Sequence, residues 1–427
     1  MTDEEIYRKF RFNLVNPGAR SMAIGGAFLS LADDATAAQA NPAGLAYLNR
    51  WEFFAELRAI DNGVRAEVQN EDLPGDVTSL IGSVFDLDDT VSPSFVAGVI
   101  PFDTGFRWTL GFSRQELLRL NTSTISSFSF TSSSQPGLFL VQGEGDIDVE
   151  VVNWNVSAGF RITDSLALGA TLTLSEMTAS SSVVNFVVDT EGVISGEEIL
   201  EPALDVRTNT DASDSDFVFN VGLIYQRPVW GLGAVFRKGP DFTVDEEILL
   251  TLEDDAPSTG LDVFGVRDVI GTPFGNRFAL PDSWGVGGYW RPGDRWTLSL
   301  DIQRILYSSL ESDFVAGLNV LTDFDAVFAA DDGTDIRFGV EHILASRRRP
   351  RLAIRFGGYL EADSTIRAVD TGTNSLASED VFEGDGDQIH GTFGLGILMR
   401  RFKVDLAADL SENRREYVVS FILQAKR

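Results

Sequence analysis

The sequence predicts an all-β protein, a 14-stranded antiparallel transmembrane β-barrel with an N-terminal plug inside its lumen. Three observations predict this fold. Segments of about ten residues alternate apolar side chains with small or polar ones, which is the pattern of membrane strands. The connections between these segments alternate between short and long. The first 48 residues lack the alternation and are rich in glycine and alanine.

The N-terminal stretch from Asn16 to Ala46 predicts a compact segment that packs inside a structure built of strands. Its small residues let backbones approach one another closely, and Pro42 prevents a helix from running through it. An ordinary surface loop is the alternative, but loops of this length are seldom so apolar. We therefore expect residues 1–48 to form the plug and residues 49–427 the barrel with long extracellular loops.

Fourteen segments show the two-residue period of strands, and an even number suits closure of a bacterial barrel. In the clearest one, Trp154 and Val156 lie on one face, with Asn155 and Ser157 on the other. The predicted strands are 51–60, 95–102, 107–120, 149–162, 166–177, 216–226, 229–238, 281–290, 295–308, 334–343, 351–361, 388–400, 402–410 and 416–425.

The connections favour a membrane barrel over a soluble β-sandwich. In a sandwich, short and long connections would not alternate along the chain in this way. The long ones are 61–94, 121–148, 178–215, 239–280, 309–333 and 362–387, with short turns between them. Short turns face the periplasm in outer-membrane barrels. Basic residues gather at the short turns and acidic residues in the long loops, where they either keep the loops soluble or bind divalent cations that bridge to lipopolysaccharide phosphates.

Composition excludes several classes of protein. No uncharged apolar run reaches the roughly 18–20 residues of a membrane helix. The formal net charge of −30 disfavours nucleic acid and an anionic bilayer surface as partners. The chain has no cysteine, so it has neither disulfides nor a lipid-anchoring cysteine. Its start does not resemble a signal peptide, and we expect a processed outer-membrane protein of a Gram-negative-type envelope from which the targeting segment has been removed.

We expect no enzymatic activity, cofactor or metal site. The two histidines, His342 and His390, lie on separate predicted strands, and no Gly-x-Ser-x-Gly motif accompanies them, although a Ser-His esterase is conceivable. The acidic runs 331–333 and 383–387 lack the distal glutamate of a calcium loop and suit flexible loop tips.

Candidate ligand-binding residues lie in two apolar loops and in the lumen. Exposed apolar patches usually mark an interaction site, although the loops could instead pack on each other. Charged residues facing the lumen normally pair, but an arginine there could hold a carboxylate head group. The candidates are Phe264, Val266, Phe314, Leu318, Phe324, Phe328, Arg337 and Arg355.

Two stretches carry a resemblance to a known family. The run GARSMAIGGAFLSLADDATAAQANPAGLA (18–46) resembles the N-terminal hatch of the outer-membrane long-chain fatty-acid transporter family (FadL-like), including its type IX secretion shuttle (PorV-like) branch. The stretch LPDSWGVG (280–287), continued by YWRPGDRWTLSLDIQRILYS (289–308), resembles a hairpin of the same family. The middle of the chain resembles the family only by its pattern.

The resemblance implies passive uptake of hydrophobic small molecules, such as long-chain fatty acids, by capture at the outer loops, transfer to a lumenal pocket and movement of the hatch. Asn41, Pro42 and Ala43 match the hatch motif and are expected to hold the plug against the wall. In the family the ligand leaves sideways through a kinked strand, whose place the sequence does not reveal. The alternative is a non-transporting barrel that serves as a protein-secretion shuttle or surface scaffold, with a protein partner at the extracellular loops.

Overall fold

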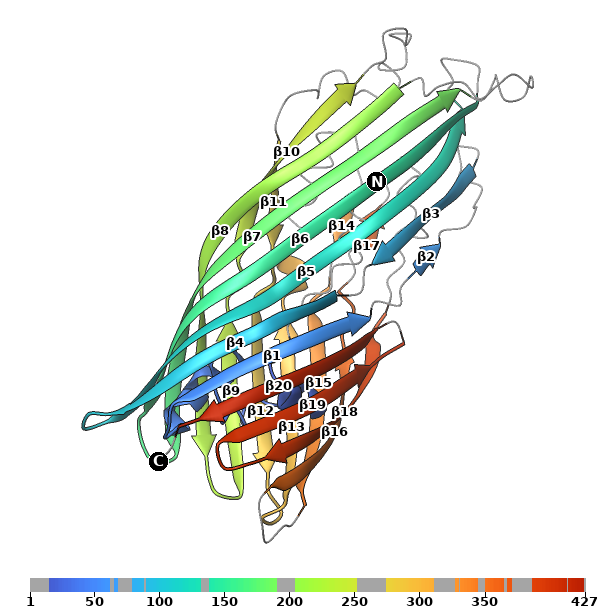
Figure 1. Cartoon of the computed structure of the whole chain (residues 1–427). Coiled ribbons are helices and arrows are strands. Elements are labelled where there is room, and N and C mark those ends of the chain that lie inside the picture. Colours follow the sequence, from blue (N-terminus) through green and yellow to red (C-terminus); the bar gives the residue numbers. More distant parts are fainter. Residues whose placement is uncertain are drawn as a thin grey trace.

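Fourteen antiparallel strands form a closed ring in the computed structural model (Figure 1). Each pairs with the next along the chain, and pairing of the first strand with the last closes the ring. The predicted 14-stranded barrel is confirmed. The strands of the ring are β1 (Glu52–Asp61), β4 (Thr90–Asp103), β5 (Arg107–Thr131), β6 (Leu138–Arg161), β7 (Leu166–Asp189), β8 (Leu204–Gln226), β9 (Trp230–Arg237), β12 (Ser283–Trp290), β13 (Trp296–Ile305), β15 (Gly333–Ile343), β16 (Arg351–Glu361), β18 (Gln388–Leu398), β19 (Phe402–Leu410) and β20 (Arg415–Gln424).

The structure describes most of the chain, with gaps mainly in the connections. The described residues are 15–61, 65–67, 79–87, 90–131, 138–189, 204–251, 274–310, 327–329, 331–344, 350–364, 367–370, 386–412 and 414–425. Shorter strands lie at the end with the long connections: β2 (Arg65–Glu67), β3 (Ser79–Leu87), β10 (Asp241–Thr251), β11 (Phe274–Ala279), β14 (Val327–Ala329) and β17 (Arg367–Asp370), together with a 3-10 turn, η3 (Tyr307–Leu310).

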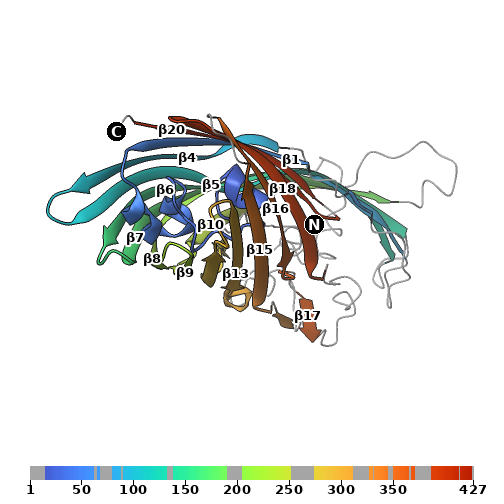
Figure 2. The same cartoon turned by 90° about the horizontal axis from the view of Figure 1, so that it is seen from below.

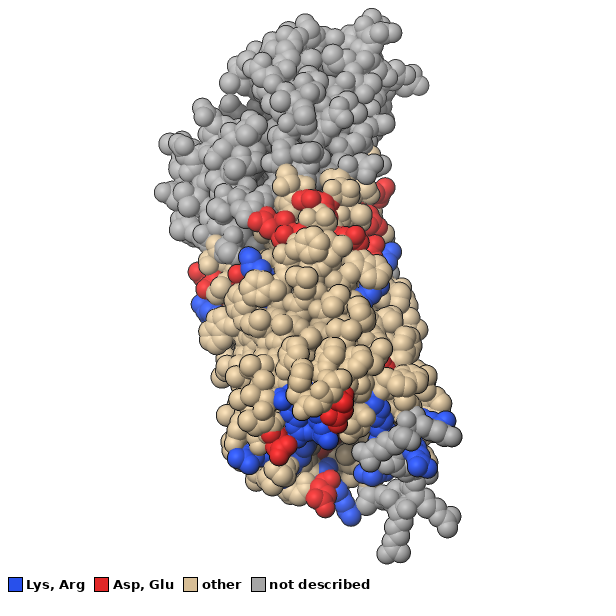
Figure 3. Space-filling model, turned by 90° about the vertical axis from the view of Figure 1, so that its left-hand side faces the viewer, with Lys and Arg blue, Asp and Glu red and all other residues tan. Residues whose placement is uncertain are grey.

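The alternation predicted for the strands determines which side chains face the lumen. On β7, Thr171, Thr173 and Ser175 are buried, whereas Leu172 between them is 57% exposed. The lumenal hydroxyls bond to the neighbouring strand, as when Thr173 donates to Asn155 Oδ1 at 2.6 Å. The outward face is apolar, as expected of a wall that faces lipid. Figure 3 shows this face as a broad uncharged zone between a basic and an acidic end.

The boundaries of four strands differ from the sequence prediction. The predicted long loops 121–148 and 178–215 are largely strand, because β5 to β8 continue well beyond a membrane's thickness. The predicted loop 239–280 likewise contains β10 and β11, which pair with each other. The polar stretches that suggested loops pair strand to strand along these extensions.

The N-terminal segment, residues 15–48, has short helices and no strand. They are α2 (Ala19–Ala23), α3 (Ala37–Ala40) and the 3-10 helix η1 (Pro42–Tyr47). Helix α2 contacts β16 and β18–β20, whereas η1 contacts β4–β8 on another part of the ring. Figure 2 shows these helices, in blue, among the strands. None of the described helices is long and apolar enough to cross a membrane.

Candidate functional site

Glycines of three neighbouring strands make room for the start of η1. A Cβ added to Gly169 of β7 would lie 2.2 Å from the carbonyl carbon of Pro42. One added to Gly159 of β6 would lie 2.8 Å from the Pro42 carbonyl oxygen, and one added to Gly222 of β8 2.0 Å from Asn41 Oδ1. No side chain fits these positions while the segment stays in place, so the wall and the segment are complementary at backbone level.

Asn41 is the most connected polar side chain of this contact. Its amide donates to the carbonyl oxygens of Leu29 at 2.9 Å, and of Leu223 and Ala234 at 3.2 Å each. Its own oxygen accepts from the backbone N–H of Ala43 at 3.2 Å, which caps η1. Asn41 is completely buried, so each of these bonds replaces a contact with water that the side chain has lost.

Tyr47 extends the contact toward the short-turn rim. Its hydroxyl donates to the Ser165 carbonyl oxygen at 2.9 Å, and the Arg161 guanidinium lies 5.4 Å from its ring centre. Burial raises the pKa of the Tyr47 phenol, so the hydroxyl keeps the proton that it donates.

A chain of charges ties the other part of the segment to the wall. Arg20 of α2 pairs with Asp33 and, at 3.0 Å, with Glu341 of β15. Glu341 also accepts from Arg355 of β16 at 2.7 Å, and Arg355 reaches Asp405 of β19 at 2.6 Å. Burial alone would lower the pKa of Arg20, but the surrounding carboxylates outweigh it and hold that pKa well above its usual value. Arg20 is therefore always charged, and a shift of the segment must break its ion pair with Glu341.

A second group of buried charges has unsatisfied hydrogen-bonding atoms. Arg337 of β15 pairs with Asp335 at 2.6 Å, but its Nε and Nη1 have no partner among the described residues. Arg237 of β9 donates from Nη2 to the Asn16 side chain at 2.9 Å and to the Ala40 carbonyl at 2.7 Å, whereas its Nη1 is unpartnered there. The two guanidinium groups are close enough to interact electrostatically. Unpaired buried N–H groups that converge beside the segment could receive an acceptor from a ligand or from water.

The wall of the barrel is split between β4 and β5. Their ladder runs from Asp103 and Arg107 to Phe95 and Gln115. Among the described residues, 116–121 of β5 pair with neither β4 nor β3, and pairing on this side of β5 resumes at Thr122, opposite Leu87 of β3. The remainder of β4 stays paired with β1 through a bulge opposite Glu56, and the remainder of β5 follows β6 through a bulge at Leu117. Bulges in both strands bend them apart.

Side chains bridge the edges of this split. Arg114 donates to the Pro93 carbonyl oxygen at 2.9 Å and lies 3.4 Å from Glu150, and Ser92 donates to Glu116. Proline has no N–H to donate to a ladder, which explains why β4 leaves β5 at this residue. The bridges are single side-chain contacts, so they resist opening less than a continuous ladder does.

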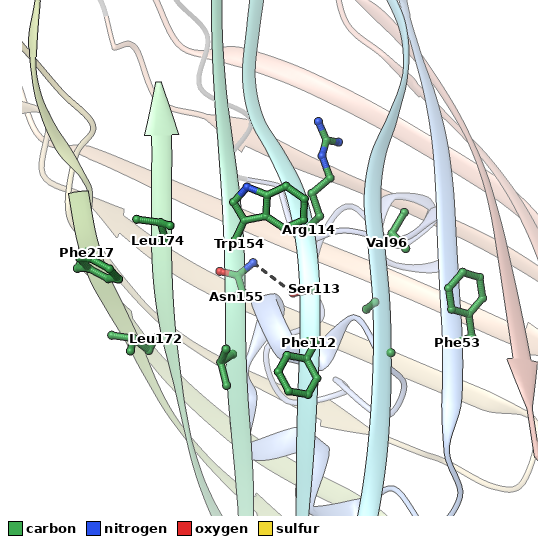
Figure 4. A pocket seen from close by; sticks show the side chains of 13 residues that line it. Phe53, Val96, Phe112, Ser113, Arg114, Trp154, Asn155, Leu172, Leu174 and Phe217 are labelled. Atoms are coloured by element: carbon green, nitrogen blue, oxygen red, sulfur yellow. Dashed lines mark hydrogen bonds between the residues drawn. The ribbon is translucent and has the colours of Figure 1, made fainter. Parts of the chain in front are cut away.

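An open apolar pocket of about 500 Å³ lies directly beside the split. Figure 4 shows aromatic and aliphatic side chains around it, with Asn155 and Ser113 joined by a 3.2 Å hydrogen bond at its base. Its large lining side chains, such as Phe112, Trp154 and Phe217, face outward and are about half exposed or more, so the pocket is a hollow in the lipid-facing side of the wall. Its lining residues are Phe53, Val96, Ala97, Gly98, Phe112, Ser113, Arg114, Trp154, Asn155, Val156, Leu172, Leu174 and Phe217.

The structure places only some of the predicted site residues. Asn41, Pro42 and Ala43 lie together against β6–β8, as described above. Arg337 and Arg355 are buried in the lumen, as expected, and Arg355 is fully engaged by two carboxylates. Phe328 lies on β14, which pairs with β17. The other candidates, Phe264, Val266, Phe314, Leu318 and Phe324, lie outside the described residues.

Sequence reasoning missed Arg237, the split and the pocket beside it. Arg237 lies at the end of a predicted strand, where nothing distinguishes a lumenal arginine from one at the interface. The split did have a signal: Pro93 precedes a strand, and proline within a sheet marks an edge or a bulge.

The fold and the uncharged outer face define an outer-membrane β-barrel with its short turns toward the periplasm. The model of the family "Outer membrane protein transport protein (OMPP1/FadL/TodX)" matches residues 10–342, and the chain belongs to this family. No curated protein sequence matches the chain significantly.

Solved structures share the fold over almost the whole chain. A FadL homologue of Pseudomonas aeruginosa aligns with a TM-score of 0.62 and 14% identity, covering 97% of this chain and 98% of its own. The toluene transporter TbuX of Ralstonia pickettii gives 0.57 and 14%, covering 97% and 100%. The toluene transporter TodX of P. putida gives 0.59 and 14%, with the same coverage. The chain therefore has the fold of outer-membrane channels for hydrophobic compounds.

Proposed function

We propose that this protein takes up hydrophobic small molecules passively and releases them sideways through the split between β4 and β5. The observation that carries the proposal is the interruption of pairing on this side of β5 after Phe95 and Gln115, next to an apolar pocket in the lipid-facing side of the wall. A hydrophobic molecule that leaves there enters the bilayer without crossing water, which is its most favourable route.

The N-terminal segment acts as the hatch in this proposal. It contacts two parts of the ring, and its seat on Gly159, Gly169 and Gly222 is made of backbone contacts with few charges. The Arg20–Glu341 pair is the polar tie on the other part. Ligand entry breaks the Arg20–Glu341 ion pair and displaces that part of the segment. Asn41, Pro42 and Ala43 stay in contact with the wall at the three glycines.

The ligand class is long-chain fatty acids or similar hydrophobic compounds. Apolar residues of the outer loops, Phe264, Val266, Phe314, Leu318, Phe324 and Phe328, would capture them first. Arg337 supports an acidic head group better than Arg355, because Arg337 keeps two unpaired nitrogens and Arg355 is held by Glu341 and Asp405. Arg237 adds a further unpaired N–H nearby. A role as a secretion shuttle or scaffold is not favoured, because the similar structures are described as transporters and channels.

The decisive experiment closes the split reversibly. The chain has no cysteine, so Ser92→Cys with Glu116→Cys introduces a unique pair across the gap. A short bis-methanethiosulfonate cross-linker is applied to cells that lack their own transporter of this class, and uptake of a radiolabelled long-chain fatty acid and of toluene is measured. We expect cross-linking to abolish uptake and reductant to restore it.

The matched control is Asn153→Cys with Ser175→Cys, a pair joined across the continuous β6–β7 ladder. Cross-linking it should leave uptake unchanged. Unchanged uptake through the closed β4–β5 split would contradict lateral release, and no uptake of either compound by the unmodified protein would contradict transport. Organic extraction of the purified protein, followed by mass spectrometry, identifies what it carries.

A further inference from the structure

Four basic residues form a compact group at the short-turn end of β16, β18 and β19, which we call the basic corner: Arg351, Arg400, Arg401 and Lys403. Arg351 pairs with Leu398 across one ladder, and Leu398 pairs with Lys403 across the next. Arg400 and Arg401 form the turn between β18 and β19, closed by a 2.9 Å bond from Met399 N–H to the Phe402 carbonyl. The three arginines are exposed and Lys403 is partly exposed.

Several arginines of the same rim contact acidic or aromatic side chains near their own turns, whereas for the corner the structure shows one electrostatic partner among the described residues, Glu52, which interacts with Lys403. Arg107 pairs with Asp103 at 3.7 Å, and Arg161 pairs with Asp164 at 3.6 Å. Arg291 lies 4.5 Å from the centre of the Tyr289 ring. The four residues of the corner have no ion pair with any carboxylate in the part of the chain that the structure describes. Their charges are therefore available to an external anion.

The surface next to the corner is shaped for acyl chains. Moving from the turn toward the membrane centre, the outward side chains are Phe402, Met399, Leu352, Ile397 and Phe356, between 39% and 60% exposed. A strand rises about 3.3 Å per residue, so these side chains cover roughly the first half of a lipid leaflet. Aromatic side chains at this level mark the membrane–water interface. A positive group above a continuous apolar face matches a lipid with an anionic head group.

We infer that the basic corner is a binding site for an anionic phospholipid of the periplasmic leaflet. Phosphate oxygens accept bidentate bonds from guanidinium groups, and each basic residue near an anionic lipid surface contributes about 1 kcal/mol. The formal net charge of −30 disfavours such a partner for the chain as a whole, but the acids that produce it are concentrated toward the other end. Salt screens interactions between exposed charges over about 10 Å. The charge of the basic corner itself, and not the net charge of the chain, therefore determines whether an anionic lipid is attracted there.

The test compares lipid retention by native mass spectrometry. The full-length protein is reconstituted in vesicles of phosphatidylethanolamine and phosphatidylglycerol in equal amounts and released in mild detergent. We expect phosphatidylglycerol to be retained preferentially, and Arg400→Gln with Arg401→Gln to lower its retention roughly tenfold or more. The control is Arg107→Gln with Arg161→Gln, which also removes two positive charges, but from arginines that pair with aspartates. It should leave the retention of phosphatidylglycerol unchanged.

Three outcomes would overturn the inference. They are equal retention of the two lipids, an equal loss in the control variant, and displacement of the lipid by inorganic phosphate or soluble peptidoglycan fragments at moderate concentration. Heat-modifiable migration on gels verifies that each variant is folded, since the exposed turn is not part of the core. Uptake activity is not the readout, so the result is independent of the proposed transport.

Discussion

The Arg20 guanidinium lies 3.0 Å from the Glu341 carboxylate and thereby joins the N-terminal segment to a strand more than three hundred positions away in the chain. Glu341 is shared with Arg355, which lies 2.7 Å away on the neighbouring strand. The bond between segment and wall is therefore one branch of a network. It can break without leaving the wall carboxylate unpaired.

Arg20→Gln is expected to loosen the segment without unfolding the barrel. Because Glu341 keeps Arg355, we expect a loss of about 1.5–3 kcal/mol, the value of a charged hydrogen bond, and not the larger cost of an orphaned buried charge. Planar-bilayer recordings should show more frequent ion-conducting openings than the unmodified protein. The double variant Arg20→Gln with Glu341→Gln should lose less stability than the sum of the two single variants, although Glu341→Gln also removes a partner of Arg355. A fully additive double variant would show that the two residues are not coupled.

Gly169→Ala should disturb the seat of η1. The new methyl would lie 2.2 Å from the Pro42 carbonyl carbon, and overpacking of this kind costs about 1–3 kcal/mol. The measurement is the temperature at which the folded, fast-migrating band disappears on gels. Gly98→Ala is the control, because a Cβ there meets nothing within 4 Å. Equal decreases in this temperature for the two variants would show that Gly169 is not needed to make room for η1.

Asn41→Ala removes three donor bonds and one acceptor bond from a completely buried position. The carbonyls of Leu223 and Ala234 keep their strand partners, so we expect a loss of about 1–3 kcal/mol. Limited proteolysis of the N-terminal segment should become faster, while the barrel stays resistant. Asn41→Asp keeps the acceptor but places a buried carboxyl group against three carbonyl oxygens, so it should speed proteolysis at least as much as Asn41→Ala. Wild-type resistance of the aspartate variant would contradict the donor role.

Asp332, just before β15, should titrate below the ordinary range for an aspartate. A hydrogen bond of 2.6 Å from the Ser308 hydroxyl is the main cause of its lowered pKa, with Arg304 at 3.4 Å adding to it. A lowered folded-state pKa gives stability that is complete above the unfolded value of about 3.9 and is lost as pH falls through the folded value. NMR titration of the Asp332 carboxyl checks this. Ser308→Ala should move the pKa upward, and an unchanged value would exclude the hydroxyl as the cause.

The central segments show how well the two-residue period predicts a membrane strand. Trp154 and Leu172 face outward, and Asn155 and Thr173 face inward, as the alternation indicated. The period does not mark the extensions of β5 to β8, whose sequences are rich in polar residues. The prediction therefore ends β5 and β7 too early and starts β6 and β8 too late, while the number of strands in the ring is correct.

The sequence by itself determined the barrel, its orientation and the non-strand nature of residues 15–48, because lipid on one side and a filled lumen on the other impose a local pattern on every strand. Only the tertiary structure decided that Gly169 lies against Pro42, that Arg20 meets Glu341, and that β4 and β5 part after Phe95. These relationships join residues far apart in the chain. Their distances depend on ring closure and strand register, which no local pattern records.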